Sequence, residues 1–144
     1  MTDQAPRLYP SMRYRDAPAA MAFLEEAFGF RRREVVANED GTIAHAELTL
    51  GPSILMLGSD RDDPLSGSRV GLGWMYVAVD DPDAHHDRAW AAGAEVVVDL
   101  HDTDYGSRDY AARDPEGNLW YFGTYRPSAD AKAGAASATG DQVS

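Results

Sequence analysis

The sequence has no cysteine among its 144 residues, few basic residues and no long apolar run. The absence of cysteine excludes disulfide bonds and thiolate chemistry, and it fits a reducing compartment such as the cytoplasm. Only 13 Lys and Arg residues stand against 24 Asp and Glu, for a formal net charge of −11. Binding to a nucleic-acid backbone needs clustered cations, so this balance argues against a nucleic-acid partner. It favours a neutral or cationic small molecule.

Signals for a membrane or for secretion are also missing. No apolar run approaches the roughly 20 residues that a membrane-spanning helix needs. The first ten residues lack the basic and apolar regions of a signal peptide. We therefore expect a cytoplasmic protein with no membrane partner. The sequence also lacks a Ser-centred elbow motif and a phosphate-binding glycine loop, so it predicts no nucleophilic or nucleotide site.

A hairpin signal stands near the C-terminal end of the sequence. Residues 114–117 (DPEG) have the residue order of a type I turn, with Asp first, Pro second and Gly last. Aromatic and apolar runs lie on both sides of this turn. The pattern predicts a β-hairpin, whatever the function of the protein.

The order of predicted elements divides the chain into two halves of one domain, residues 8–126. Alternation and capping signals predict a strand, a helix and three strands in residues 8–58, and the same series in residues 73–126. A Ser-, Gly- and Asp-rich linker is predicted over residues 59–72. The ends, residues 1–7 and 127–144, are small and polar, and we expect a flexible N-terminus and a disordered tail.

The two halves match at a fixed offset of 65 positions. This offset relates Asp16 to Asp81 and Ala46 to Ala111, and it also relates Leu57 to Phe122. Self-similarity at a fixed offset is typical of repeated supersecondary units that bury their apolar faces together.

The segments VAVDDPDAHHDRAWAAGAEVV and YGSRDYAARDPEGNLWYF resemble the vicinal oxygen chelate superfamily. This superfamily includes glyoxalases, extradiol dioxygenases and bleomycin-resistance binding proteins. RYRDAPAAMAFLEEAFGF is similar to the opening helix of the same family, and the helix start at residues 81–84 is closest to the bleomycin-resistance branch. The resemblance implies an α+β fold with two βαβββ modules, whose curled mixed sheets surround a cavity that a second copy completes in a homodimer.

The resemblance also implies four positions for metal ligands, in the first and last strands of each module. These positions hold Tyr9, Met56, Trp74 and Tyr121. Metal-dependent relatives carry His, Gln or Glu there, whereas aromatic and thioether groups are poor ligands for divalent metals. We therefore expect no metal ion and no cofactor.

Four other residues are weaker candidates for metal ligands. His45 and Glu47 lie two apart on one predicted strand and share a face, opposite the apolar face of that strand. Two ligands without a third make a weak metal site, so polar contacts in the cavity or a pair within the strand are the expected roles. His85 and His86 are adjacent on a predicted helix, and we expect them on its solvated surface.

Strand alternation predicts a cavity lined by aromatic side chains, a methionine and a few charges. The candidate ligand-binding residues are Tyr9, Arg13, His45, Glu47, Met56, Trp74, Tyr76, Arg108, Tyr110 and Tyr121. Such a lining suits a flat aromatic or cationic ligand held by stacking and cation–π contacts. The alternative is that these side chains fill a closed core, although a dry core more naturally uses Phe and Leu.

Three hypotheses about function follow. The first is a metal-free binding protein of the bleomycin-resistance type that sequesters a small aromatic or cationic molecule, such as an antibiotic. The second is a lyase, isomerase or dioxygenase-like enzyme with an unusual site around His45 and Glu47. The third is a structural or regulatory module that binds no small ligand. Whether any reaction is catalysed stays open, because one superfamily fold supports many chemistries.

Overall fold

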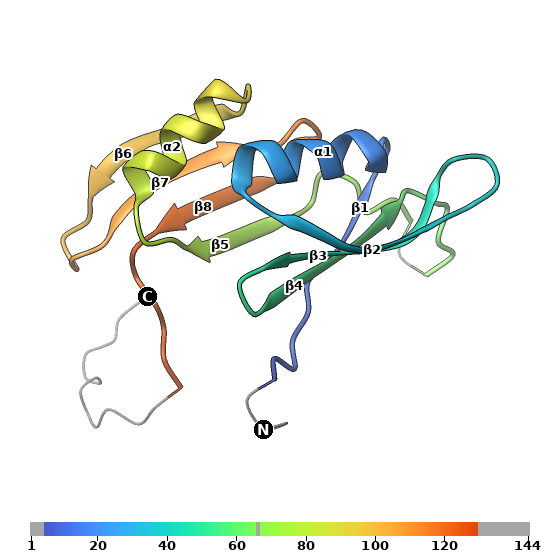
Figure 1. Ribbon diagram of the computed structural model, residues 1–144, viewed down its shortest axis with the longest axis horizontal. Coiled ribbons are helices and arrows are strands. Elements are labelled where there is room, and N and C mark those ends of the chain that lie inside the picture. The colour runs from blue at the N-terminus through green and yellow to red at the C-terminus, as the bar shows by residue number, and fades with distance from the viewer. Residues whose placement is uncertain (1–4, 66, 130–144) are drawn as a thin grey trace.

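The computed structural model describes residues 5–65 and 67–129, and it contains two helices and two sheets (Figure 1). The elements are, in chain order, β1 (Ser11–Tyr14), α1 (Ala17–Phe28), β2 (Arg31–Ala37), β3 (Ile43–Leu50), β4 (Ser53–Ser59), β5 (Trp74–Ala78), α2 (Pro82–Ala91), β6 (Glu95–Asp102), β7 (Arg108–Arg113) and β8 (Leu119–Gly123). A strand, a helix and three strands thus occur twice, and the predicted α+β fold with two βαβββ modules is confirmed. The predicted flexible N-terminus and disordered tail lie largely outside the described residues.

Both helices begin at an aspartate that caps their first turn. The Asp16 carboxylate accepts a hydrogen bond from the Ala19 backbone N–H at 3.1 Å, and the Asp81 carboxylate accepts one from Ala84 at 3.1 Å. These bonds satisfy backbone donors that have no partner inside the helix. α1 stops at Gly29, whose φ of 86° lies in the left-handed region that glycine adopts without strain.

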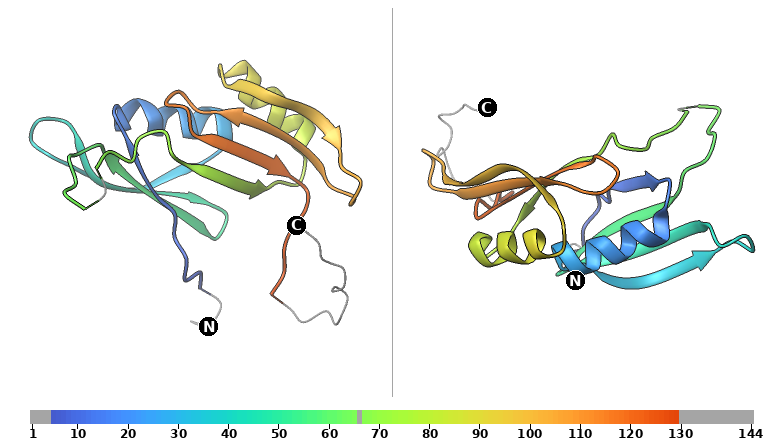
Figure 2. Two further views of the ribbon diagram at one scale, coloured as in Figure 1. Left: turned by 180° about the vertical axis from the view of Figure 1, so that it is seen from behind. Right: turned by 90° about the horizontal axis from the view of Figure 1, so that it is seen from above.

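Each module forms one four-stranded mixed sheet. The strand order is β1-β4-β3-β2 in the first module and β5-β8-β7-β6 in the second. The first strand of each module pairs in parallel with the last, and the remaining pairs are antiparallel. Both helices lie on one side of the two sheets, and the described chain ends leave from the other side (Figures 1 and 2). We call the sheet surfaces away from the helices the open faces.

The two modules share one hydrophobic core between the helices and the sheets. Helix α1 of the first module reaches the second sheet, where the Phe28 ring lies 5.4 Å from the Trp120 ring and 4.8 Å from the Phe122 ring. All three side chains are buried. Because each module fills part of the other's core, the two modules stabilise each other.

The hairpin turn between β7 and β8 fixes the second module against the start of α1. The buried Asp114 carboxylate accepts a hydrogen bond from the Tyr14 hydroxyl at 2.6 Å. The Glu116 carboxylate accepts two more, from the backbone N–H groups of Arg15 at 2.6 Å and Asp16 at 2.8 Å. The predicted turn therefore also joins the two modules.

The connection between the modules is irregular. Strand β4 continues to Ser59, and the described residues between it and Trp74 form turns and loop. Neither helix of the described chain is long and apolar enough to cross a membrane.

Candidate ligand-binding site

The open face of the first module carries a short chain of charged groups. Alternation along β3 buries Ala46 and Leu48 in the core and leaves His45 and Glu47 on the open face. His45 Nε2 lies 2.9 Å from Glu47 Oε2, and the Arg33 guanidinium donates to Glu47 Oε1 at 2.6 Å. The hydrogen bond with His45 and the charge of Arg33 lower the pKa of the Glu47 carboxyl. Glu47 is therefore an anion that orients both of its neighbours.

The open face of the second module is aromatic. Tyr76 of β5 pairs in register with Tyr121 of β8, and Trp74 lies on the same face two residues before Tyr76. The Trp74 ring is 72% exposed, and its centroid lies 6.3 Å from that of Tyr121 in an edge-to-face arrangement. The Tyr76 hydroxyl donates to the Tyr125 carbonyl at 2.6 Å. These rings present flat apolar surface to a planar ligand.

Three further predicted residues belong to the first module. Arg13 lies between two core residues of β1, so its side chain extends from the open face, and its guanidinium donates to the Ser59 carbonyl at 3.4 Å. Met56 of β4 pairs in register with Glu47 and shares its face. Tyr9 precedes β1 and is partly exposed. The first module thus carries Arg13, His45 and Glu47, and the open face of the second sheet carries Trp74, Tyr76 and Tyr121.

The predicted positions of Tyr110 and Arg108 on the cavity side are wrong. Tyr110 has no exposed surface and pairs in register with Phe122, a core residue. The Arg108 guanidinium donates to the Asp83 carboxylate of α2 at 2.7 Å. Both side chains therefore lie on the helix side of β7, away from the open face.

A one-residue difference between the two modules explains this error. Leu57 and Phe122 occupy equivalent places in the last strands, 65 positions apart. Their partners in the antiparallel ladder are Ala46 and Tyr110, which are only 64 positions apart. The β7–β8 hairpin is thus one residue longer than the β3–β4 hairpin, and a shift of one residue moves every side chain of a strand to the other face. The fixed offset had wrongly equated Ala46 with Ala111.

The predicted position of His85 is also wrong, because this residue lies between the modules and not on a solvated helix surface. Its Nδ1 lies 2.5 Å from the Tyr110 hydroxyl, and its Nε2 lies 3.3 Å from the Phe28 carbonyl of α1. A carbonyl can only accept, so Nε2 donates and Nδ1 accepts from Tyr110. Burial lowers the pKa of His85, which keeps the ring neutral in this role. His86 makes a separate contact with Asp87 at 3.1 Å.

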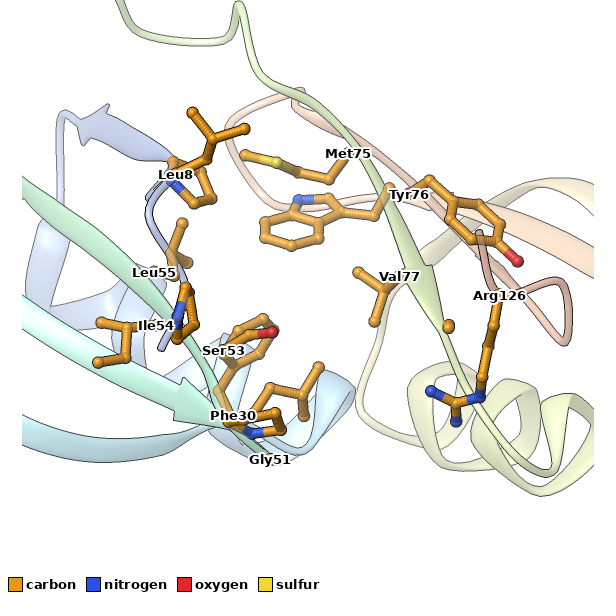
Figure 3. Close-up of a pocket in the computed structure, with 16 residues that line it drawn as sticks. Leu8, Phe30, Gly51, Ser53, Ile54, Leu55, Met75, Tyr76, Val77 and Arg126 are labelled. Carbon is orange, nitrogen blue, oxygen red and sulfur yellow. The ribbon is translucent and has the colours of Figure 1, made fainter. Parts of the chain in front are cut away.

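A pocket of about 480 Å³ lies between the two modules. Figure 3 shows Leu8, Ile54 and Leu55 on one side of it, and Met75, Tyr76 and Val77 of β5 on the other. The Arg126 guanidinium stands beside β5 and pairs with Asp80 at 2.8 Å. The volume and the mainly apolar lining are within the range of small-molecule sites.

Sequence reasoning missed most of this pocket. Of the ten candidate residues, Tyr76 alone lines it. The other walls come from residues 6–10, from the β3–β4 turn at residues 50–55 and from the core side of β5. Strand alternation predicts which side chains share a face, but it does not predict how the edges of two sheets meet.

The four positions that the resemblance assigns to metal ligands do not fit a metal ion. They hold two phenols, a thioether and an indole, from Tyr9, Tyr121, Met56 and Trp74. Divalent metals of such enzymes prefer imidazole and carboxylate donors. Across residues 5–65 and 67–129, no three His, Cys, Asp or Glu side chains are grouped so that they could hold a metal.

Comparisons with known proteins agree with the fold. The family model described as "Glyoxalase/Bleomycin resistance protein/Dioxygenase superfamily" matches residues 8–122. The chain is 33% identical over 125 residues to "Uncharacterized protein Rv0887c" of Mycobacterium tuberculosis, across 82% of this chain and 74% of that protein.

Solved structures give the same result. TioX from Micromonospora sp. ML1 has a TM-score of 0.72 and 34% identity, across 82% of this chain and 97% of that one. A glyoxalase/bleomycin resistance protein/dioxygenase family enzyme from Burkholderia phytofirmans PsJN has a TM-score of 0.65 at 23% identity, across 80% of this chain and 94% of its own, and it shows a shared fold. With the family model covering both βαβββ modules, the chain belongs to the glyoxalase/bleomycin resistance protein/dioxygenase superfamily.

Proposed function

We propose that this protein is a cytoplasmic, metal-free binding protein of the bleomycin-resistance type, which sequesters a small aromatic or cationic molecule such as an antibiotic. One observation carries the proposal. Trp74 is 72% exposed on the open face, at a position where metal-dependent relatives are expected to carry a ligand. A large apolar ring in water is costly to leave uncovered, and exposed aromatic patches mark binding surfaces.

The surroundings of Trp74 support stacking on a planar ligand. The Tyr121 ring packs edge-to-face against the Trp74 indole at a centroid distance of 6.3 Å, and Tyr76 extends the aromatic surface along β5. Stacked aromatic pairs contribute about 0.5–1.5 kcal/mol beyond the area that they bury. The net charge of −11 adds a long-range attraction for a cationic ligand.

A second copy of the chain is part of the proposal. Each open face lacks a helix, so an isologous homodimer would cover both faces and enclose the ligand between them. Light scattering at micromolar concentration tests this point and should give twice the 15.7 kDa mass of the chain. A monomer at that concentration would remove the enclosed cavity from the proposal and leave a surface site.

A thermal-shift screen over antibiotics and small metabolites tests the binding function. The protein is treated with a chelator, freed of metal, and screened beside an untreated sample whose metal content is measured. A ligand that raises the melting temperature of both samples equally supports metal-free binding. Stoichiometric metal in the untreated sample, with ligand binding only there, would refute it.

An enzyme is the second candidate, and the arrangement of His45 favours it. Glu47 orients the imidazole at 2.9 Å, and this pairing resembles a general base held by a carboxylate. The His45 side chain is partly exposed, so a substrate on the open face could reach it. If the protein is a lyase or isomerase, His45→Gln abolishes turnover and leaves substrate affinity nearly unchanged. If it is a binding protein, no turnover is found and His45→Gln changes affinity alone.

A further inference from the structure

A buried carboxylate stands on the open face of the second module, at the start of β7. Asp109 is 7% exposed and pairs in register with Gly123 of β8. A Cβ atom at residue 123 would collide with the Asp109 carboxylate and lie 3.0 Å from the Tyr76 hydroxyl. Glycine at this position therefore leaves the space that the carboxylate and the Tyr76 side chain need.

The Asp109 carboxylate has hydrogen bonds but no cationic partner in the described part of the chain. Oδ1 accepts a short hydrogen bond from the Ser107 hydroxyl, and Oδ2 accepts a long one of 3.4 Å from the Tyr105 hydroxyl. The arginines on either side of this region are engaged elsewhere. Arg108 pairs with carboxylates on the helix side of β7, and Arg126 pairs with Asp80. A carboxylate accepts up to about four hydrogen bonds, so Oδ2 has capacity left.

Three exposed tyrosine rings are grouped beside this carboxylate, with Tyr125 in contact with both Tyr76 and Tyr105. The Tyr125 ring centroid lies 6.5 Å from that of Tyr76 and 6.0 Å from that of Tyr105, and the latter pair is nearly perpendicular. The Tyr76 hydroxyl is fixed by the Tyr125 carbonyl at 2.6 Å. Burial first, and then the charge of Asp109, raise the pKa of both Tyr76 and Tyr105, so the phenols are neutral at physiological pH.

We propose that Asp109 and the rings of Tyr76, Tyr105 and Tyr125 form a binding site for an organic ammonium group. Aromatic faces attract such cations, and a nearby carboxylate neutralises their charge. A single carboxylate among phenols offers too few oxygen ligands for Ca²⁺ or Mg²⁺, which take six or more. The inference rests on the proposed binding function, because it assigns the cationic part of the ligand to one end of the same open face.

Choline and its uncharged carbon isostere, dimethylbutanol, are matched probes for this site. Calorimetric titration of the full chain should show saturable choline binding that is about tenfold or more tighter than binding of the isostere. Asp109→Asn keeps the shape of the side chain and removes its charge, and it should weaken choline binding about tenfold without changing the isostere. Asp104→Asn is the control, because this exposed aspartate of the preceding turn carries the same charge near Tyr105. It should change choline affinity less than about twofold.

Two ring variants complete the test and guard against misfolding. Tyr105→Phe keeps the ring and should keep choline binding, whereas Tyr105→Ala should weaken it; a melting curve for each variant confirms that it is folded. Equal binding of choline and isostere, or an unchanged affinity in folded Asp109→Asn, would overturn the inference. Loss of a dimer in Asp109→Asn with unchanged choline affinity would assign Asp109 to contact between copies instead. None of these results affects the aromatic ligand site at Trp74, whose failure would appear in the antibiotic and metabolite screen.

Discussion

Replacing Asp114 by alanine should destabilise the whole protein, although the residue lies in a surface hairpin. Its Oδ2 atom accepts hydrogen bonds from the Tyr14 hydroxyl at 2.6 Å, the Asn118 side-chain amide at 3.0 Å and the Trp120 indole N–H at 3.1 Å. Oδ1 accepts two backbone N–H groups, from Glu116 at 3.0 Å and Asn118 at 3.1 Å. The three side-chain donors are fully buried, so Asp114→Ala leaves them without their carboxylate acceptor and without access to water.

The expected loss follows from these donors. A buried donor left unsatisfied costs about 1–3 kcal/mol, so the free energy of unfolding should fall by about 3–5 kcal/mol. Urea denaturation followed by tryptophan fluorescence measures this value, against a total stability of about 5–15 kcal/mol for a domain of this kind. Tyr14→Phe is the matched control, because it removes one donor and leaves the carboxylate its other partners. It should cost about 1–2 kcal/mol.

A double-variant cycle then separates the shared hydrogen bond from general damage. The combined Tyr14→Phe and Asp114→Ala protein should be more stable than the sum of the single losses predicts, by about 1 kcal/mol, because both changes remove the same bond. A loss below about 1 kcal/mol for Asp114→Ala would refute the account of this turn as the joint between the modules.

Three further predictions concern neighbouring features. Glu116→Ala removes the acceptor of two backbone N–H groups ahead of α1 and should lower the free energy of unfolding by about 1 kcal/mol in urea denaturation. An unchanged free energy of unfolding would show that the Glu116 carboxylate lies in solvent and does not make these hydrogen bonds. Gly123→Ala forces a Cβ atom against the Asp109 carboxylate and should lower stability by about 1–3 kcal/mol, whereas an unchanged melting temperature would show that the strand can shift. Burial lowers the pKa of His85 below 6.5, so the unfolded chain binds a proton first as the pH falls. The stabilisation that neutral His85 gives to the folded state is present above about pH 6.5 and is lost as the pH falls below it. The stability advantage of the wild type over His85→Gln should therefore shrink between pH 7.5 and 5, and a constant difference would contradict this prediction.

The helices and most strands could be predicted because their signals are local. An aspartate before each helix supplies the cap, and Gly29 supplies the left-handed residue that ends α1. The repeated order of a strand, a helix and three strands in each half follows from such signals. Such features depend on a few neighbouring residues, so they can be predicted from a short stretch of the sequence.

The faces of strands were harder to predict where they depend on loop length. In β3, the apolar and polar residues alternate, so the open-face position of His45 and Glu47 follows from the sequence. In β7, residues 109–112 are all buried, and alternation gives no sign of direction. The face on which Tyr110 lies depends instead on the length of the β7–β8 hairpin, which is one residue longer than the β3–β4 hairpin.

The contacts between modules could not be predicted from either module alone. The sequence predicts His85 on the solvated surface of a helix, yet its ring contacts the Tyr110 hydroxyl of β7 and the Phe28 carbonyl of α1. The apolar pocket and the surroundings of Asp109 have the same origin. Both sites combine residues that are distant in sequence, and these residues come together only because β5 and β8 pack beside the first module.

The most direct test of the proposed function is the affinity of Trp74→Ala for a ligand from the antibiotic and metabolite screen, measured after chelator treatment. Trp90→Ala is the control, because Trp90 is 65% exposed on α2, far from the open faces. We predict that chelation leaves wild-type binding intact, that Trp74→Ala weakens it by about 1–3 kcal/mol, and that Trp90→Ala changes it little. Unchanged affinity in folded Trp74→Ala, or loss of wild-type binding on chelation, would contradict a metal-free aromatic site on the open face.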